Sequence, residues 1–186
     1  MIVVVVLLAI PLIAVGSLVL IYNGLVQGRN HCDEAWADID AELKRRYDLI
    51  PNLVRTVQGY AKHEREVLDH VSQARTTAMA NNGSPASQAR DENQLVHGVR
   101  QLMAVAESYP DLKANQNFLA LQTELANTED RIQRSRRFYN ANVRDYQNRL
   151  QIFPFNLIAS AFNFQPREFF EIDDAAQREA PAVQSV

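Results

Sequence analysis

Residues 2–22 read Ile-Val-Val-Val-Val-Leu-Leu-Ala-Ile-Pro-Leu-Ile-Ala-Val-Gly-Ser-Leu-Val-Leu-Ile-Tyr, and this stretch contains no charged side chain. As an α-helix it would extend roughly 31 Å, which matches a hydrocarbon core of about 30 Å. Pro11 removes one backbone hydrogen bond, but proline is commoner in membrane helices than in soluble ones. Tyr22 stands where an interfacial aromatic would stand. The stretch therefore predicts a transmembrane helix over residues 1–24.

A cleaved signal peptide is the competing interpretation. It needs a basic amino-terminal region, a shorter apolar core and a cleavage site of small residues. The first basic residue is Arg29, and Cys32 follows Asn30 and His31 rather than the small residues that precede a lipidated cysteine. We therefore favour a permanent anchor.

The basic residues around this helix predict its orientation. None precedes it, whereas Arg29, Lys44, Arg45 and Arg46 follow it. Because Lys and Arg are enriched in cytoplasmic flanks, we expect a single-pass protein with the N-terminus outside and the following domain in the cytoplasm.

Composition limits what the rest of the chain can be. The 186 residues leave room for one domain of about 150 residues beside the anchor. A single cysteine excludes a disulfide-stapled domain and a multi-cysteine metal site. A net charge of −3 argues against nucleic-acid binding, and six glycines make a glycine-rich phosphate loop improbable. We expect no cofactor, no metal and no small-molecule substrate.

Helical spacing of apolar residues dominates after Tyr22. It predicts long helices over residues 25–47, 51–80, 87–108 and 112–152, within an all-α domain at 25–170 and before a disordered tail at 171–186. Turn signals at Asn81–Pro85 and at Tyr109-Pro110 separate the later helices. The last helix carries a heptad seam: Phe118, Leu121, Leu125, Thr128, Ile132, Ser135, Tyr139, Asn142, Tyr146, Leu150 and Phe153.

The chain around Pro51 allows two interpretations. Asp48 could cap a new helix whose first turn holds Pro51, which would make a sharp reversal. The apolar spacing also runs on through Ile50 and Leu53, which suits one kinked helix. We favour the break, because the residue before a proline resists the α conformation.

Two stretches of opposite charge are expected to lie at the same distance from the membrane. Residues 33–42 hold five acids and no base, whereas residues 131–149 hold six arginines and one acid. Antiparallel packing of the first and last helices would let these stretches face each other, within one protomer or between two. Two unrelated solvated faces are the alternative. The predicted pairing involves Asp33, Glu34 and Asp38 on one side and Arg134, Arg137 and Arg144 on the other.

Six of the eight phenylalanines lie between residues 152 and 170. Pro154 should end the preceding helix, and a short helix from about Leu157 to Phe162 is expected after it. The segment could cap the open end of a bundle, or it could contact lipid or another subunit. The candidate contact residues are Phe153, Phe155, Leu157, Ile158, Phe162 and Phe164.

Candidate catalytic residues are sparse. His63 and His70 stand seven residues apart with Glu66 between them, which is not the spacing of a zinc protease. His31 and Cys32 are adjacent and cannot share a helix face. The arginines at 131–137 are followed by Phe138 and Tyr139, aromatics that suit a helix core better than a nucleic-acid surface. No catalytic residue is predicted.

A resemblance to a known family rests mainly on the run Arg45-Arg46-Tyr47-Asp48-Leu49-Ile50-Pro51-Asn52-Leu53-Val54. Shorter motifs accompany it: Ala35-Trp36, Gly59-Tyr60, His63-Glu64, Arg136-Arg137 and Phe153-Pro154. These motifs resemble the LemA family over nearly the whole chain after the membrane helix. The resemblance implies a bacterial single-pass membrane protein with an antiparallel four-helix bundle and no established catalytic activity.

Two functions fit these expectations. The first is a self-associating scaffold of the cell envelope, since tethering in a plane raises the effective concentration of the domain. The alternative is a membrane-tethered binding module that recruits a protease, a sensor or another envelope partner. The expected partners are other copies of the chain, the lipid bilayer and envelope proteins.

Overall fold

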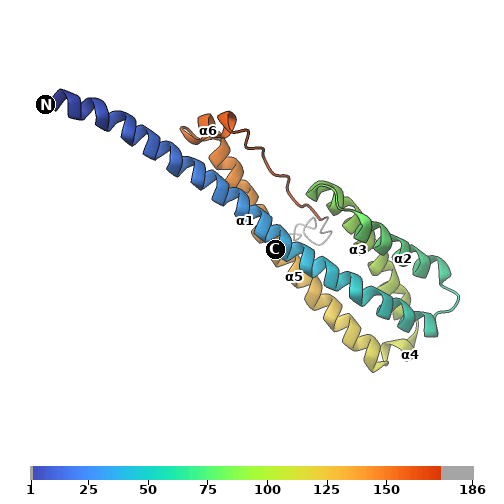
Figure 1. Cartoon of the computed structure of the whole chain (residues 1–186). Helices are drawn as coiled ribbons and strands as arrows, with labels where there is room; N and C mark the ends of the chain where they lie inside the picture. Colours follow the sequence, from blue (N-terminus) through green and yellow to red (C-terminus); the bar gives the residue numbers. More distant parts are fainter. Residues whose placement is uncertain (1, 173–186) are drawn as a thin grey trace, which may run out of the picture. The chain divides into compact units, whose positions relative to one another are not determined.

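The computed structural model describes residues 2–172, and the helices in this range are α1 (Ile2–Tyr60), α2 (Arg65–Ala80), α3 (Pro85–Glu107), α4 (Pro110–Lys113), α5 (Gln116–Gln151) and α6 (Phe155–Ala161) (Figure 1). The described residues contain no strand, which confirms the all-α class. Most of the tail that was predicted to be disordered, residues 173–186, lies outside the described residues.

The preferred break at residues 48–51 is wrong, because α1 continues through Pro51 to Tyr60. Pro51 has no N–H to donate to the carbonyl of Tyr47, four residues earlier. The side chain of Arg75 on α2 supplies that donor, with its Nε 2.6 Å from the Tyr47 carbonyl oxygen. A residue 28 positions away thus compensates for the proline.

The break that the sequence placed at Pro51 occurs instead at residues 61–64, between α1 and α2. The next turn lies where it was expected. Asn81 Oδ1 accepts a hydrogen bond from the Gly83 amide at 2.8 Å, and Ser84 Oγ caps α3, whose first residue is Pro85. Proline at the first helical position after a serine cap is a common helix start.

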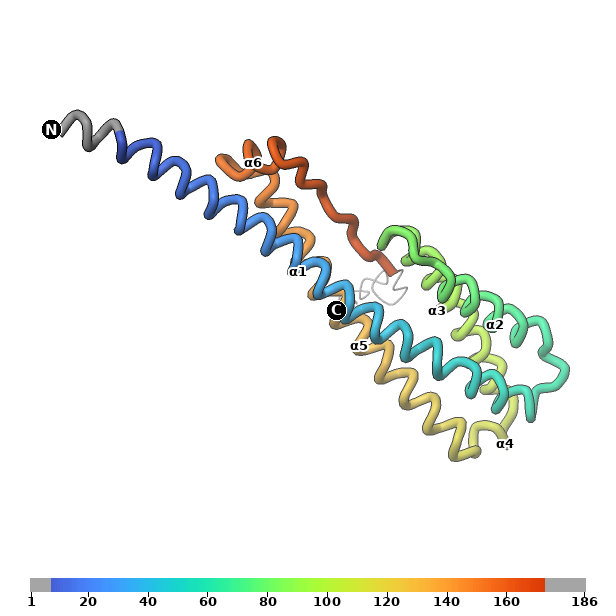
Figure 2. The backbone as a smooth tube through the Cα atoms, in the orientation of Figure 1, coloured from blue at the N-terminus to red at the C-terminus, as the bar shows by residue number. Residues whose placement is uncertain are grey.

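The chain divides into two compact units, which are described separately. Unit 1 comprises Met1–Ala41 and Ile132–Phe169, and unit 2 comprises Glu42–Arg131 with the chain from Phe170 onward. In unit 2, α2 and α3 pack against each other (Figure 2), and the fully buried side chains include Leu43, Leu95 and Leu102. The four-helix bundle and the predicted domain boundaries stay predictions.

In unit 1, α5 runs antiparallel to α1. The rings of Trp36 and Tyr139 meet edge-on with centroids 5.2 Å apart. Gly28 lies against the ring of Tyr146, and Arg149 Nη1 donates to the carbonyl oxygen of Gly24 at 3.3 Å. Residue numbers therefore fall along α1 as they rise along α5. Of the predicted seam, Ile132, Tyr139 and Tyr146 are buried in unit 1, and Phe118, Leu125 and Thr128 are buried in unit 2.

Gly28 makes this close packing possible. A methyl group on Gly28 would lie 3.2 Å from Cδ2 of Tyr146, whereas one on Gly59 would meet nothing within 4 Å. Replacing a helical glycine by alanine gains up to about 1 kcal/mol of helix propensity. We expect Gly59→Ala to show this gain in thermal unfolding of the detergent-solubilised protein. Gly28→Ala should be less stable than Gly59→Ala by roughly 1 kcal/mol or more, because the buried Tyr146 must move. Equal gains would show that the Tyr146 ring is loosely packed.

Candidate functional site

The N-terminal half of α1 exposes a continuous apolar surface. Every described side chain from Leu8 to Leu20 is exposed. A core helix of a soluble protein would bury such side chains. Among the described residues, α1 is the one helix long and apolar enough to cross a membrane. This observation fits a single-pass membrane protein.

Aromatic side chains gather where this exposed surface ends. The Tyr22 ring lies 4.9 Å from that of Phe162 and 5.6 Å from that of Phe164, both edge-on. A methyl group on Gly24 would lie 3.7 Å from the Phe155 ring. We call Tyr22, Phe155, Phe162 and Phe164 the aromatic collar. The guanidinium of Arg29 lies 5.7 Å from the centroid of the Phe164 ring.

A helix-ending motif builds the collar from the C-terminal side. The predicted short helix exists as α6, after Pro154 as expected. Asn163 adopts a φ of 56°, a left-handed conformation that asparagine tolerates better than most residues. The Phe164 amide then donates to the Ala159 carbonyl at 2.9 Å, and the Asn163 amide to that of Ser160 at 3.3 Å. This pair of bonds is a Schellman motif, and it turns the chain so that Phe164 reaches Tyr22.

The six candidate contact residues divide into two sets. Phe153, Leu157 and Phe162 are 74%, 58% and 52% exposed, whereas Phe155, Ile158 and Phe164 are half-buried. Ile152, which the sequence reasoning did not include, is also exposed. The segment therefore packs on unit 1 with part of its apolar surface and presents the rest outward.

The extended chain after α6 is fixed along α1 and α5. Tyr139 Oη donates to the Glu168 carbonyl at 2.8 Å, and Gln147 Nε2 donates to the Arg167 carbonyl at 2.5 Å. Arg167 Nη2 pairs with Asp33 Oδ1 at 2.5 Å. Burial raises the pKa of Tyr139 to about 12, with a further contribution from Cys32. Burial also raises the pKa of the Cys32 thiol.

The Tyr139 hydroxyl should make stability fall at high pH. The unfolded chain releases this proton near pH 10, whereas the folded protein holds it until about pH 12. Between these values the unfolded state binds fewer protons, so the free energy of unfolding decreases as the pH rises. We expect Tyr139→Phe to flatten this decline, and to cost about 0.5–1.5 kcal/mol at neutral pH through its lost hydrogen bond. Thermal unfolding from pH 8 to 11.5 tests this, and parallel curves for both proteins would contradict it.

The two charged stretches that were expected to face each other make one direct contact in the structure. Glu42 and Arg131, at the ends of the two stretches, approach to 3.6 Å within unit 2. Of the six named residues, Asp33 pairs with Arg167, a partner that the sequence reasoning missed. Glu34, Asp38, Arg134, Arg137 and Arg144 are exposed. The register of α1 and α5 places Asp38 near the height of Arg137, and the pairing of these residues stays a prediction.

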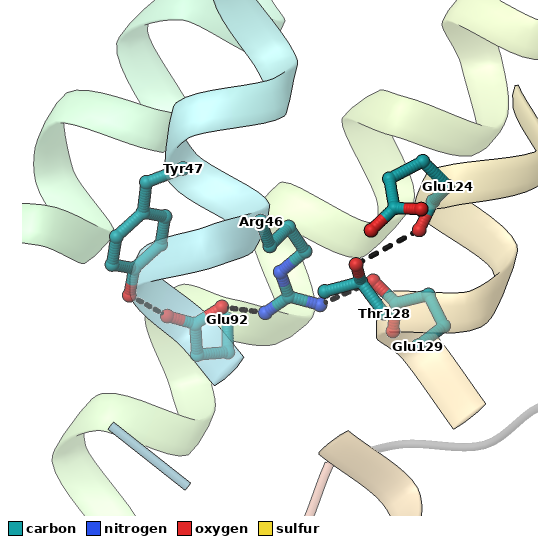
Figure 3. A network of polar contacts seen from close by, with 6 residues as sticks. All are labelled: Arg46, Tyr47, Glu92, Glu124, Thr128 and Glu129. Atoms are coloured by element: carbon teal, nitrogen blue, oxygen red, sulfur yellow. Dashed lines mark hydrogen bonds and ion pairs between the residues drawn. The ribbon is translucent and has the colours of Figure 1, made fainter. Parts of the chain in front are cut away.

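Unit 2 contains a buried ion network that the sequence reasoning also missed (Figure 3). Arg46 and Glu92 are almost completely buried and pair with each other, and Tyr47 Oη donates to the same carboxylate. Arg46 Nη1 also binds Glu129 Oε1 at 2.7 Å. Arg46 lies among the buried positions Leu43, Tyr47 and Ile50 of α1, so an arginine beside an apolar helical stripe was the available signal.

The weak catalytic candidates gain no support. A raised pKa keeps the Cys32 sulfur in its thiol form at neutral pH, and the side chain is buried. His63 and His70 are exposed. Among the described residues, no three His, Cys, Asp or Glu side chains are grouped to hold a metal ion.

Comparisons with known proteins identify the relatives of this chain. Magnetosome protein MamQ 2 of Paramagnetospirillum magneticum is 26% identical over 182 residues, which cover 84% of this chain and 67% of that protein. Protein LemA of Metamycoplasma hominis is 27% identical over 157 residues, which cover 81% of this chain and 72% of that protein. Magnetosome protein MamQ of Magnetospirillum gryphiswaldense is 23% identical over 179 residues, covering 83% and 66%. None of these names refers to an enzymatic activity.

The family model described as the LemA family matches residues 35–184, which is most of the chain after the apolar part of α1. The resemblance inferred from the motif around Arg46 and Pro51 is thereby confirmed. The chain belongs to the LemA family.

Proposed function

We propose that this protein is a self-associating helical scaffold of the bacterial cell envelope, anchored in the inner membrane, that carries out no catalysis. One observation carries the proposal. The helix α1 passes without interruption from its exposed apolar part into both compact units. Within unit 1 the apolar part of α1 and the surface on which α5 packs belong to the same helix, so these packed helices are held at the membrane without a flexible linker. Confinement to a plane raises the effective concentration of such domains.

The number of copies per particle tests self-association. The full-length protein is purified in detergent, reconstituted into lipid nanodiscs, and measured by light scattering and mass photometry at micromolar concentration. We expect particles with more than one copy. A strictly monomeric protein in both environments would overturn the scaffold. Recovery of that monomer with one stoichiometric envelope protein would support the binding module instead.

The proposed orientation has the N-terminus outside and the domain in the cytoplasm. The fold supports it by gathering arginines beside residues 24–33 of α1: Arg149 binds the Gly24 carbonyl, and Arg167 binds Asp33. Arg29 lies between Gly24 and Asp33 in the sequence of α1. Together these arginines add positive charge at the domain side of the anchor, which favours the cytoplasmic face.

Topology reporters test this orientation. A fluorescent protein fused to the C-terminus should be fluorescent in cells, and a phosphatase that needs export should be inactive at the same position. Intact mass spectrometry of the purified protein should give the mass of the chain with residues 2–22 present. The reverse reporter pattern overturns the orientation, and loss of those residues overturns the anchor.

A further inference from the structure

We propose that residues 152–164, with α6 at their centre, form a second membrane contact that lies in the phospholipid headgroup layer beside α1. The occupant of their exposed apolar surface is the bilayer, not another protein. The inference rests on the membrane-anchored part of the proposed function. It does not depend on self-association, because one copy of the chain suffices for it.

The height of the collar relative to the bilayer is the first argument. If residues 2–22 fill the hydrocarbon core, Tyr22 lies at its boundary. The rings of Phe162 and Phe164 touch Tyr22 within unit 1, so they lie at the same boundary. The headgroup region occupies roughly 5–8 Å beyond it. The contacts between α6 and α1 therefore place α6 in or beside this layer.

The outward surface of the segment has the chemistry of an interfacial element. Four large apolar side chains, Ile152, Phe153, Leu157 and Phe162, are more than half exposed on or beside a helix of seven residues. Aromatic and aliphatic side chains of this kind favour the boundary between headgroups and acyl chains. The surface continues the exposed apolar surface of α1, because Phe162 adjoins Tyr22 and Leu20 is exposed.

Two arginines flank the collar at the height of lipid phosphates. Arg149 contacts the Gly24 carbonyl, and Arg29 lies against Phe164; both residues are exposed. Gly24 and Arg29 lie roughly 3 and 10 Å past Tyr22 along the helix. A guanidinium binds phosphate oxygens with charge-assisted hydrogen bonds. Apolar side chains at the core boundary and guanidinium groups beyond it match the layering of a phospholipid leaflet.

Depth measurements on the full-length protein test the proposal. In a Cys32→Ala background, single cysteines replace Phe153, Leu157 or Phe162 and carry an environment-sensitive fluorophore. The protein is placed in nanodiscs of phosphatidylcholine and phosphatidylglycerol that contain nitroxide lipids. The control is Asp38→Cys, an exposed site on α1 of the same unit, 16 residues after Tyr22, which is about 24 Å along the helix.

A second series keeps Cys32, so the test does not depend on its replacement. It uses Phe153→Trp or Phe162→Trp with Trp36→Phe, and brominated lipids as the quencher. Circular dichroism checks that each variant keeps its helix content.

We expect lipid quenching at residues 153, 157 and 162 to place the probes about 15 Å from the bilayer centre, near the edge of the core, and no lipid quenching at residue 38. Quenching at α6 no stronger than at residue 38 would overturn the proposal. Shielding from aqueous iodide without lipid quenching would also overturn it, because that pattern indicates a protein contact. Copy number is counted separately, so a monomer with strong lipid quenching would remove the scaffold and leave the second membrane contact standing.

Discussion

Replacement of Arg46 by methionine should destabilise the protein by about 3–5 kcal/mol, because the substitution leaves a buried carboxylate without its cation. Glu92 is 1% exposed, and after this substitution it keeps the hydrogen bond from the hydroxyl of Tyr47. A loss of this size should lower the midpoint of thermal unfolding by roughly 6–20 °C in a domain of 150–250 residues. Circular dichroism of the full-length protein in detergent measures it.

The neighbouring arginine provides a matched control. The side chain of Arg45 is 46% exposed and pairs with Glu42 at 3.6 Å. Since exposed ion pairs contribute about 0–1 kcal/mol, Arg45→Met should change stability little. Equal effects at the two positions would show that Arg46 is solvated and that the buried network contributes no more to stability than an exposed ion pair.

Removal of the three buried residues of the network, Arg46, Tyr47 and Glu92, should restore most of the stability that Arg46→Met loses. The triple variant Arg46→Met, Tyr47→Phe and Glu92→Leu replaces both buried charged groups and the tyrosine hydroxyl, so none of these groups is left without a partner. Apolar replacement of a complete buried ion pair is often neutral or stabilising by about 1–4 kcal/mol. A triple variant that is no more stable than Arg46→Met would show that the loss comes from altered packing and not from the isolated carboxylate.

The helices, including the long apolar one at the N-terminus, could be predicted from the sequence because their signals are local. Apolar spacing over residues 87–108 and 112–152 predicted α3 and α5 to within a few residues, and Asn81–Pro85 predicted the turn between α2 and α3. Pro154 correctly ended the long helix before α6. Each of these signals depends on residues within one or two turns of chain.

The collar and the ion network could not be assembled from local signals. In the collar, Tyr22 near the start of the chain meets Phe162 and Phe164 near its end, and in the ion network Arg46 reaches Glu129 across 83 positions. The side chain that meets a given charge depends on helix register, which charge counting alone does not determine. The spacing of Gly24 and Gly28 was one usable signal that we overlooked. Small residues four apart let another element approach a helix closely, and here Phe155 and Tyr146 occupy the space.

The wrong break at Pro51 has the same origin and leads to the second large prediction. The cost of a proline inside a helix depends on whether another group satisfies the carbonyl that it leaves without a donor. Arg75 does so for Tyr47 at 2.6 Å. Arg75→Met should therefore cost about 1.5–3 kcal/mol, the range for a hydrogen bond from a charged donor. Chemical denaturation of the full-length protein measures this cost.

A double-mutant cycle isolates that hydrogen bond from other effects of the two substitutions. In Pro51→Ala, the alanine amide can donate to the Tyr47 carbonyl, so the loss of Arg75 should matter less by about 1 kcal/mol or more. Arg90→Met is the control, because Arg90 is an exposed arginine on α3, whereas Pro51 lies on α1 and Arg75 on α2. Its effect should be the same in both backgrounds to within about 0.5 kcal/mol. If Arg75→Met costs as much with alanine at position 51 as with proline, the arginine does not replace the missing amide, and α1 tolerates Pro51 for another reason.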